Sequence, residues 1–394
     1  MELQAIQQKL QPCRLWVARL DESANPPIEA NRFPLTWQDL HHPELARMVE
    51  NYRLDEVVGT PHDEIEQLLR LRNWVFHNVP RGLPEWNPDQ AWLLADLARN
   101  GRGFYCSHYA DVLMYAATAL GWPARHVGID CDHAEGERST HHGVTEVFSY
   151  ELDKWILLDA MFDVHFEHRG EVLSVLGIRN TLLERGEKAI GRMVGPGRKK
   201  TATRRDVAPA GFDHAGCYFW FHIPTRNNYF SQPAWQGNER SLLYIDDANR
   251  NKTWYQNRYG RKNEFLGSRL HSGLRSGKFV RTESVADVYP SLGRTHIDID
   301  LSLPRSKDQP VLPVVLHTIN PYWHSFEVRF DENGQWVPVG RHVDWRLHAG
   351  RNVIDARLVT MPGRTGVAAK VEMTIKASAP DDPQRNRSRR RTQR

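Results

Sequence analysis

The hydrophobic residues of this chain follow two periods, and the change from one to the other divides the sequence. Between residues 61 and 185, apolar residues that recur every three or four positions alternate with short apolar runs typical of strands. From residue 294 onward the period is two, as in residues 296–303, and Pro, Gly and Asn turns separate the runs. The sequence therefore predicts an α+β fold, in which a mixed core precedes an all-β sandwich.

The expected elements divide the chain into five regions. Helices are expected at residues 37–51, 65–77, 90–99, 106–120 and 172–185. Strands are expected at residues 14–20, 125–129, 141–148, 155–159, 217–223, 296–303, 326–330, 336–339, 353–359 and 371–375. The regions are a lead-in (1–60), the mixed core (61–185), an irregular aromatic and polar extension packing on the core (186–293), the β-sandwich (294–378) and a disordered basic tail (379–394).

One expected helix places a cysteine in its first turn. Apolar positions between residues 109 and 120 recur at helical spacing, and Gly121 and Pro123 end the helix. Cys106 lies where the positive end of the helix dipole favours a thiolate. Such a cysteine is a candidate nucleophile. For a lone cysteine a buried, inert side chain is the better interpretation, and the residues downstream change this balance.

Downstream, a hairpin offers a histidine and a carboxylate. The strands at 141–148 and 155–159 are joined by a short polar break, as in a β-hairpin. Partners in a hairpin have a constant sum of residue numbers. A sum of 301 places His142 directly opposite Asp159, and a sum of 303 makes them diagonal neighbours on the same face. With Cys106, they are the nucleophile, base and orienting group of an acyl-transfer triad.

Three motifs in this order resemble the transglutaminase-like superfamily, whose core is a circularly permuted papain-type fold. The motifs are C-x-x-Y-A-x-x-L from Cys106 with its Leu-Gly-Trp-Pro-Ala-Arg exit at 120–125, H-x-x-x-E-V-F from His142, and W-x-x-L-D ending at Asp159. The resemblance implies that Cys106 is the nucleophile, His142 the base and Asp159 the orienting group. The family commonly has an aromatic residue two positions after the histidine, and this chain has Val144, which puts the wall of an acyl-acceptor site in doubt.

Several residues near the motifs are weaker candidates for substrate contacts. They are Trp86, Trp92, Tyr105, His108 and His141. The two tryptophans lie on or after a loop that precedes the nucleophile, and such loops often line a cleft. Either tryptophan could equally belong to the hydrophobic core.

Two other functional classes compete with the thiol enzyme. Asp130, Cys131 and His133, followed by His165 and His168, supply many metal-capable groups, so a zinc-dependent hydrolase is one alternative. Their spacing matches no helical HExxH pattern, and we expect these histidines to lie at the surface or the rim of a cleft. The second alternative is a catalytically silent scaffold whose β-sandwich does the binding.

Composition and charge narrow the remaining classes. The formal charge of +4 is carried by residues 380–394, which hold six Arg and two Asp, so the rest of the chain is neutral and no basic face for nucleic acid is expected. The four cysteines form no CxxC pair, which argues against a disulfide scaffold. No signal sequence or membrane span is visible, so a cytoplasmic location is expected.

The sequence as a whole favours a cysteine peptidase or amidase, with acyl transfer to an amine as the second outcome. The expected substrate is a peptide or protein amide, with or without a linked glycan, and no cofactor or metal is expected. Residues 347–352, with the pattern L-x-x-G-x-N, weakly resemble the corner of immunoglobulin-like modules in bacterial enzymes. That resemblance favours a bacterial hydrolase.

Overall fold

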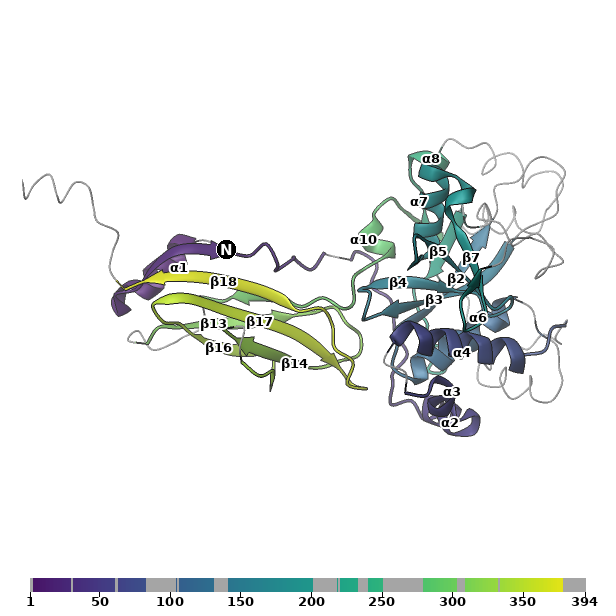
Figure 1. Ribbon diagram of the computed structural model, residues 1–394, viewed down its shortest axis with the longest axis horizontal. Helices are drawn as coiled ribbons and strands as arrows, with labels where there is room; N and C mark the ends of the chain where they lie inside the picture. The colour runs from purple at the N-terminus through teal and green to yellow at the C-terminus, as the bar shows by residue number, and fades with distance from the viewer. Residues whose placement is uncertain are drawn as a thin grey trace, which may run out of the picture. The chain divides into compact units, whose positions relative to one another are not determined.

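The computed structural model describes residues 3–29, 31–60, 63–82, 104, 106–130, 141–200, 218, 220–232, 240–250, 279–302, 309–331 and 334–377. The chain forms two compact units (Figure 1). Residues 30–290 form one unit, and residues 1–29 join residues 291–394 in the other. The first 29 residues are therefore part of the C-terminal unit, whereas the sequence suggested a separate lead-in over residues 1–60.

The unit of residues 30–290 is built on a six-stranded sheet in the order β11-β10-β9-β2-β3-β4. Its strands are β2 (Ala124–Asp130), β3 (His141–Ser149), β4 (Lys154–Leu158), β9 (Trp220–Pro224), β10 (Ser241–Tyr244) and β11 (Phe279–Thr282). Neighbouring strands are antiparallel except for β10 and β11. A second sheet has the order β6-β5-β7-β8 and contains β5 (Val164–His168), β6 (Glu171–Val172), β7 (Gly191–Val194) and β8 (Lys199–Lys200).

Helices surround these sheets. They are α2 (Pro43–Tyr52), α3 (Leu54–Val58), α4 (Glu64–Asn78), α6 (Cys106–Ala119), α7 (Val175–Arg185), α8 (Asp247–Arg250) and α10 (Val285–Val288). Helix α6 contacts β2 and β3 and also contacts α2 and α4 (Figure 1). The Thr145 hydroxyl of β3 donates to the Ala110 carbonyl at 2.8 Å, and the Tyr109 hydroxyl donates to the Val79 carbonyl. These bonds anchor the first turns of α6 on both the sheet and the segment after α4.

Helix α4 is fixed at its start by two carboxylates. The Asp63 side chain caps the helix by accepting from the Ile65 N–H at 2.8 Å. The buried Glu64 carboxylate accepts from the Ser149 hydroxyl at 2.6 Å and from the Glu151 N–H at 2.9 Å. The first turn of α4 is thereby bonded to the turn of the β3–β4 hairpin.

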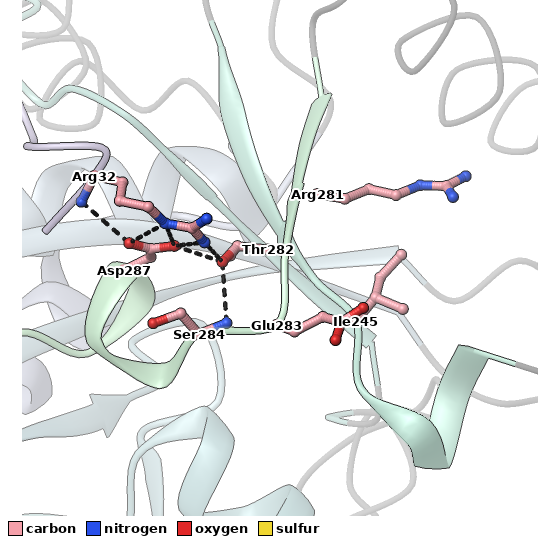
Figure 2. A pocket seen from close by; sticks show the side chains of 7 residues that line it. All are labelled: Arg32, Ile245, Arg281, Thr282, Glu283, Ser284 and Asp287. Carbon is pink, nitrogen blue, oxygen red and sulfur yellow. Dashed lines mark hydrogen bonds and ion pairs between the residues drawn. The ribbon is translucent and has the colours of Figure 1, made fainter.

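An ion pair between the exposed Arg32 side chain and the buried Asp287 carboxylate joins the places where the chain enters and leaves this unit (Figure 2). Arg32 donates to Asp287 through Nε at 3.0 Å, and Thr282 donates to the same carboxylate at 2.6 Å. Asp287 is fully buried, and burial by itself would raise the pKa of its carboxyl group. The hydrogen bonds from Arg32 and Thr282 outweigh this effect and lower the pKa. An open cavity of about 960 Å³ beside this pair is lined by Arg32, Ile245, Arg281, Thr282, Glu283, Ser284 and Asp287. Because Asp287 already has its partners, we interpret this group as a structural clamp.

The second unit contains two antiparallel sheets. One has the order β1-β18-β17-β14-β15 and the other the order β12-β13-β16. Their strands are β1 (Trp16–Asp21), β12 (His296–Ile299), β13 (Val311–His317), β14 (Trp323–Phe330), β15 (Val337–Val339), β16 (His342–Arg346), β17 (Gly350–Thr360) and β18 (Ala369–Lys376). Alternate residues are buried along β14, β16 and β18, as the period of two predicted. Strand β1, preceded by α1 (Leu3–Leu10), completes the larger sheet by pairing with β18.

Asn352 explains the L-x-x-G-x-N pattern in structural terms. Its side chain is buried, accepts from the His348 N–H at 2.8 Å and donates to the His348 carbonyl at 2.8 Å. Gly350 adopts a φ of 109°, which side-chain-bearing residues rarely tolerate. The pattern therefore closes the corner at the start of β17.

Three tryptophans of this unit differ in burial. Trp345 is 1% exposed and belongs to the core of this unit, whereas Trp323 and Trp336 are half-buried beneath arginine side chains.

Most expected elements appear with shifted ends. The helix expected at 37–51 begins later, at Pro43, because His42 caps it. The helix expected at 172–185 begins at Val175, because residues 171–172 form β6. The helix expected at 90–99 and the tail at 379–394 lie outside the described residues. No helix among the residues that the structure describes is both long and apolar enough to span a membrane.

Candidate active site

Cys106 is the first residue of α6 and carries a half-buried, reduced thiol. The approach to the helix is tied to the segment after α4, because the Phe104 N–H donates to the Pro80 carbonyl at 2.7 Å. The Gly82 N–H returns a bond to the Phe104 carbonyl at 3.1 Å. The structure therefore confirms the expected placement of Cys106 in the first helical turn.

Gly143 lets β3 come close to the start of α6. A Cβ atom at Gly143 would lie 3.1 Å from Ser107 Cα and 2.9 Å from His126 Nε2. The His126 ring is held by Asp111 of α6, with 2.8 Å between Nδ1 and Oδ1. Ser107 follows Cys106 and Gly143 follows His142, so this close contact also brings the backbones of Cys106 and His142 together.

His142 and Asp159 meet as diagonal neighbours across the β3–β4 hairpin. The observed pairs, such as Thr145 with Leu158, have a residue sum of 303, which is one of the two registers anticipated from the sequence. The distance between His142 Nε2 and Asp159 Oδ2 is 2.8 Å. Both side chains are 1% exposed, so the contact lies in the protein interior.

The carboxylate of Asp159 is held by the backbone on its other side. Oδ1 accepts from the Met161 N–H at 3.0 Å and from the Phe162 N–H at 3.3 Å. The Phe162 ring lies 5.3 Å from the His142 ring, centroid to centroid. Arg81 lies over the Phe162 ring and donates to the Met161 carbonyl, so it also fixes this turn.

The surroundings of His142 favour its charged form. Burial alone would lower the pKa of His142, but the charge and hydrogen bond of Asp159, followed by the hydrogen bond and charge of Cys106, raise it from 6.5 to about 10. Because Nε2 faces Asp159, Nδ1 is the ring nitrogen left for Cys106. The three side chains can therefore hold a thiolate–imidazolium pair at neutral pH, with a carboxylate behind the imidazolium.

Two other motif residues form a structural pair. Arg125 and Glu146 face each other on β2 and β3, and Nη2 and Oε2 are 2.6 Å apart. The second Glu146 oxygen accepts from the Val175 N–H and the Tyr289 hydroxyl, each at 2.8 Å. These contacts join the sheet to α7 and to Tyr289, the residue after α10.

The structure describes only some of the residues that the sequence suggested for substrate contacts. His108 is half-buried, and its ring lies 5.1 Å from the Phe104 ring. The His141 backbone pairs with Asp130 in the sheet. Val144, which replaces the aromatic residue common in the family, is 1% exposed and belongs to the hydrophobic core. Trp86, Trp92 and Tyr105 lie outside the described residues.

Sequence reasoning missed a buried charged network behind Asp159. Arg72 of α4 is fully buried and donates to Asp163 Oδ1 at 2.8 Å. A signal was present, because Arg72 lies at helical spacing between Leu68 and Val75 and so falls on the apolar stripe of its helix. A charge in such a stripe is rarely buried without a partner.

The expectation that His165 lies at the surface or the rim of a cleft is wrong. His165 is fully buried between Arg72, 2.7 Å from Nδ1, and Glu167, 2.9 Å from Nε2. Burial, together with the charges of Arg72 and Arg198, lowers its pKa to about 2. Both ring nitrogens are occupied, so His165 cannot bind a metal without breaking this network.

The other histidines that the structure describes give no support to a zinc site. His168 Nδ1 lies 2.8 Å from the Ala189 carbonyl. Among the described residues, which omit 131–140, no group of three His, Cys, Asp or Glu side chains is placed to hold a metal ion. His133 lies outside them.

Comparisons with known proteins support the family at the level of this segment. A crystal structure described as a "Putative Cysteine Protease from Cytophaga hutchinsonii" matches with 19% identity, a TM-score of 0.24, and coverage of 30% of this chain and 41% of that chain. This chain thus spans less than half of that protein, and a likeness of this size carries no argument. No curated protein matches the sequence. The model of the transglutaminase-like superfamily matches residues 52–160, which contain Cys106, His142 and Asp159. This segment of the chain therefore belongs to the transglutaminase-like superfamily.

Proposed function

We propose that the protein is a thiol-dependent acyl-transfer enzyme in which Cys106, His142 and Asp159 act together. The observation that carries this proposal is the position of His142, which is bonded to Asp159 and held next to Cys106 with its pKa raised to about 10. A buried, charged imidazole beside a cysteine at a helix N-terminus stabilises the thiolate.

In the proposed reaction, the Cys106 thiolate attacks the carbonyl carbon of an amide, and the C=O electron pair moves to oxygen. The Cys106 backbone N–H, in the first turn of α6, contributes to binding of that oxyanion. When the C–N bond breaks, Nδ1 of His142 gives its proton to the leaving amine and a thioester remains. Asp159 keeps Nε2 protonated, so that Nδ1 faces the reacting atoms.

We propose hydrolysis as the second half of the reaction. Water gives up a proton to His142 as its oxygen bonds to the thioester carbonyl carbon, and the C–S bond then breaks to release a carboxylic acid and the Cys106 thiolate. Val144 supports this choice, because its side chain is in the core and does not form the aromatic wall associated with an acyl-acceptor site. The proposed substrate is a peptide or protein amide, with or without a linked glycan. An amine in place of water would give transamidation.

The proposal is tested without knowledge of the substrate by alkylation with iodoacetamide at pH 6–7, followed by mass spectrometry of the labelled peptides. Cys106 is expected to react at least about tenfold faster than Cys13, Cys131 and Cys217, because its thiolate fraction is larger. His142→Ala should remove this advantage. The matched variant Cys13→Ala should leave it unchanged, because Cys13 lies in the other unit.

Equal labelling of the four cysteines in the folded protein would overturn the proposal. The same assay tests the zinc alternative, since a metal-bound thiolate is protected and EDTA would then accelerate labelling. We expect no effect of EDTA. Once an amide substrate is found, Cys106→Ala should abolish its turnover with little change in Tm, whereas a silent scaffold would lose nothing.

A further inference from the structure

The turn that carries Asp159 is closed by Asp163, which is bonded to α4. Asp159 and Val164 form an antiparallel bridge, with N–O distances of 2.9 and 3.0 Å. Asp163 has a φ of 51°, and its carboxylate accepts from Arg72 Nε and from Asn73 Nδ2, each at 2.8 Å. Two side chains of α4 therefore hold the end of a turn whose first residue orients His142.

Arg72 uses its guanidinium in three directions. Besides Asp163, it lies 2.7 Å from His165 Nδ1 and donates to the Gly195 carbonyl at 3.0 Å. Arginine has no acceptor, so Nδ1 of His165 accepts and its Nε2 carries the proton donated to Glu167. His165 is thus neutral and lies between Arg72 and Glu167. Arg72 is the cation of this network that bonds to Asp163, at the end of the Asp159 turn.

Helix α4 is bonded to the hairpin at two places. Glu64, at its start, accepts bonds from Ser149 and Glu151 in the hairpin turn. Arg72 follows eight residues later, about 12 Å along the helix axis. It reaches the segment just past the other end of β4. The two contacts hold both ends of β4 against the same helix. They therefore also hold the position of Asp159 relative to His142.

The charge of Arg72 also acts on Asp159. Burial lowers the pKa of the Arg72 guanidinium, and the charges of Asp163 and then of Asp159 oppose this effect. Interaction between two charges is mutual, so the Arg72 guanidinium and the Asp159 carboxylate attract each other. Little water screens this effect, because the side chains of Arg72 and Asp159 are at most 1% exposed.

We propose that Arg72 is a positioning residue for Asp159, holding the 159–164 turn through Asp163 and keeping the Asp159 carboxylate directed at His142. This inference rests on the proposed thiol chemistry, in which the Asp159 carboxylate sustains the imidazolium and hence the Cys106 thiolate. Arg72 touches neither Cys106 nor the atoms that would react. Its effect should therefore appear as a shift in the pH dependence of Cys106 reactivity.

The test is the rate of Cys106 alkylation by iodoacetamide between pH 5 and 10 in the full chain. The charged groups that face Asp159, its turn and the network behind it are His142, Arg81, Arg72, Asp163, Glu167 and Arg198. The double variant Arg72→Met/Asp163→Asn removes the ion pair without leaving an unpaired buried charge. The matched control is Arg179→Met/Asp246→Asn, because Arg179 is 1% exposed and paired with Asp246 at 2.6 Å.

In the wild type we expect the acid limb of the profile, where the rate rises with pH, to reach its half-maximum at a pH below the ordinary thiol pKa of about 8.5. The Arg72→Met/Asp163→Asn variant should move this limb to higher pH by about one unit or more, which is up to about a tenfold loss of rate at pH values on the limb. At pH 10, where the thiolate is formed in every variant, its rate should stay within about threefold of the wild type. Arg72→Lys should restore part of the acidic limb because it keeps the charge.

The outcomes separate the two proposals. A wild type without selective Cys106 reactivity overturns the proposed function. A selective wild type whose profile is shared by the Arg72→Met/Asp163→Asn variant overturns only the role of Arg72, as does an equal shift in the Arg179 control. If the double variant does not fold, Arg72→Gln/Asp163→Asn, whose two neutral side chains can still hydrogen-bond to each other, decides by the same readout.

Discussion

Gly143 of β3 lies against Ser107 of α6, and a Cβ on the glycine would stand 3.1 Å from Ser107 Cα. Each is the chain neighbour of a proposed catalytic residue. The register of a hairpin can bring His142 to Asp159, but bringing both to Cys106 also requires contact between strand β3 and helix α6.

Gly143→Ala is therefore expected to damage the site. The added methyl group meets backbone at Ser107 and the His126 ring, so β3 and α6 must separate, at a cost of about 1–3 kcal/mol. Cys106 alkylation at pH 6.5 should fall at least about tenfold, because the thiolate loses its imidazolium partner. Gly197→Ala is the control, since a Cβ at Gly197 meets no atom within 4 Å. An unchanged rate in Gly143→Ala would contradict this account of the site.

Asp159→Asn should disable His142 while the fold persists. Two backbone N–H groups, of Met161 and Phe162, already donate to Oδ1, so the amide oxygen of an asparagine should stay there. Its NH₂ group then faces Nε2 and favours the tautomer with a proton on Nδ1, which cannot accept from Cys106. By analogy with serine triads, kcat on an amide substrate should fall by about 10²–10⁴.

The control for that variant is Asp287→Asn, which alters an equally buried carboxylate in the Arg32 clamp (Figure 2). It should lower Tm without changing the alkylation rate of Cys106. An Asp159→Asn protein that keeps wild-type alkylation at pH 6.5 would exclude Asp159 from the proposed triad.

His165 should make the protein less stable in acid. Its folded pKa of about 2 lies below the ordinary 6.5, so below pH 6.5 the unfolded chain binds a proton that the folded protein refuses. Stability from this group is complete above pH 6.5 and declines by up to about 1.4 kcal/mol for each pH unit below it. His165→Gln can keep both hydrogen bonds without titrating. Urea unfolding at pH 6.5, 5.5 and 4.5 should show that the free energy of unfolding falls less with decreasing pH in His165→Gln than in the wild type. An equal fall in both proteins would contradict this prediction.

His142 should behave in the opposite sense. Its folded pKa is raised to about 10, so its contribution to stability is complete below pH 6.5 and is lost as the pH rises toward 10. His142→Gln should therefore be destabilised most below pH 6.5, and its difference from the wild type should close by pH 10. Unfolding at pH 6, 8 and 10 measures the trend, and a constant difference would show that the imidazole is not charged in the folded state.

Asn352→Ala should destabilise only the unit that contains β17. It removes bonds to the His348 N–H and carbonyl from a buried corner, which should cost about 1–3 kcal/mol. The exposed Gln335→Ala should stay within about 0.5 kcal/mol of the wild type. Cys106 alkylation should be unaffected in both variants. A parallel loss of Cys106 reactivity would mean that the corner also supports the site.

Local patterns in the sequence were sufficient for the elements that carry the proposed site. The spacing of apolar residues after Cys106 specifies α6, and the alternation around His142 and Asp159 specifies the hairpin, because both periods arise from the geometry of a single element. The shared face of His142 and Asp159 also followed from the sequence, since both anticipated registers preserve it. The family motifs added the order in which these parts occur.

Contacts between distant segments were decided only by the tertiary structure. The pairing of β1 with β18 joins residues 16–21 to residues 372–376, and no local period encodes a partner so far away. The burial of His165 depends on Arg72, 93 residues earlier, and a histidine in a polar sequence context gives no sign of such a neighbour. Side-chain chemistry and local period are properties of the sequence, whereas burial and the charges around a group depend on which segments the fold brings together.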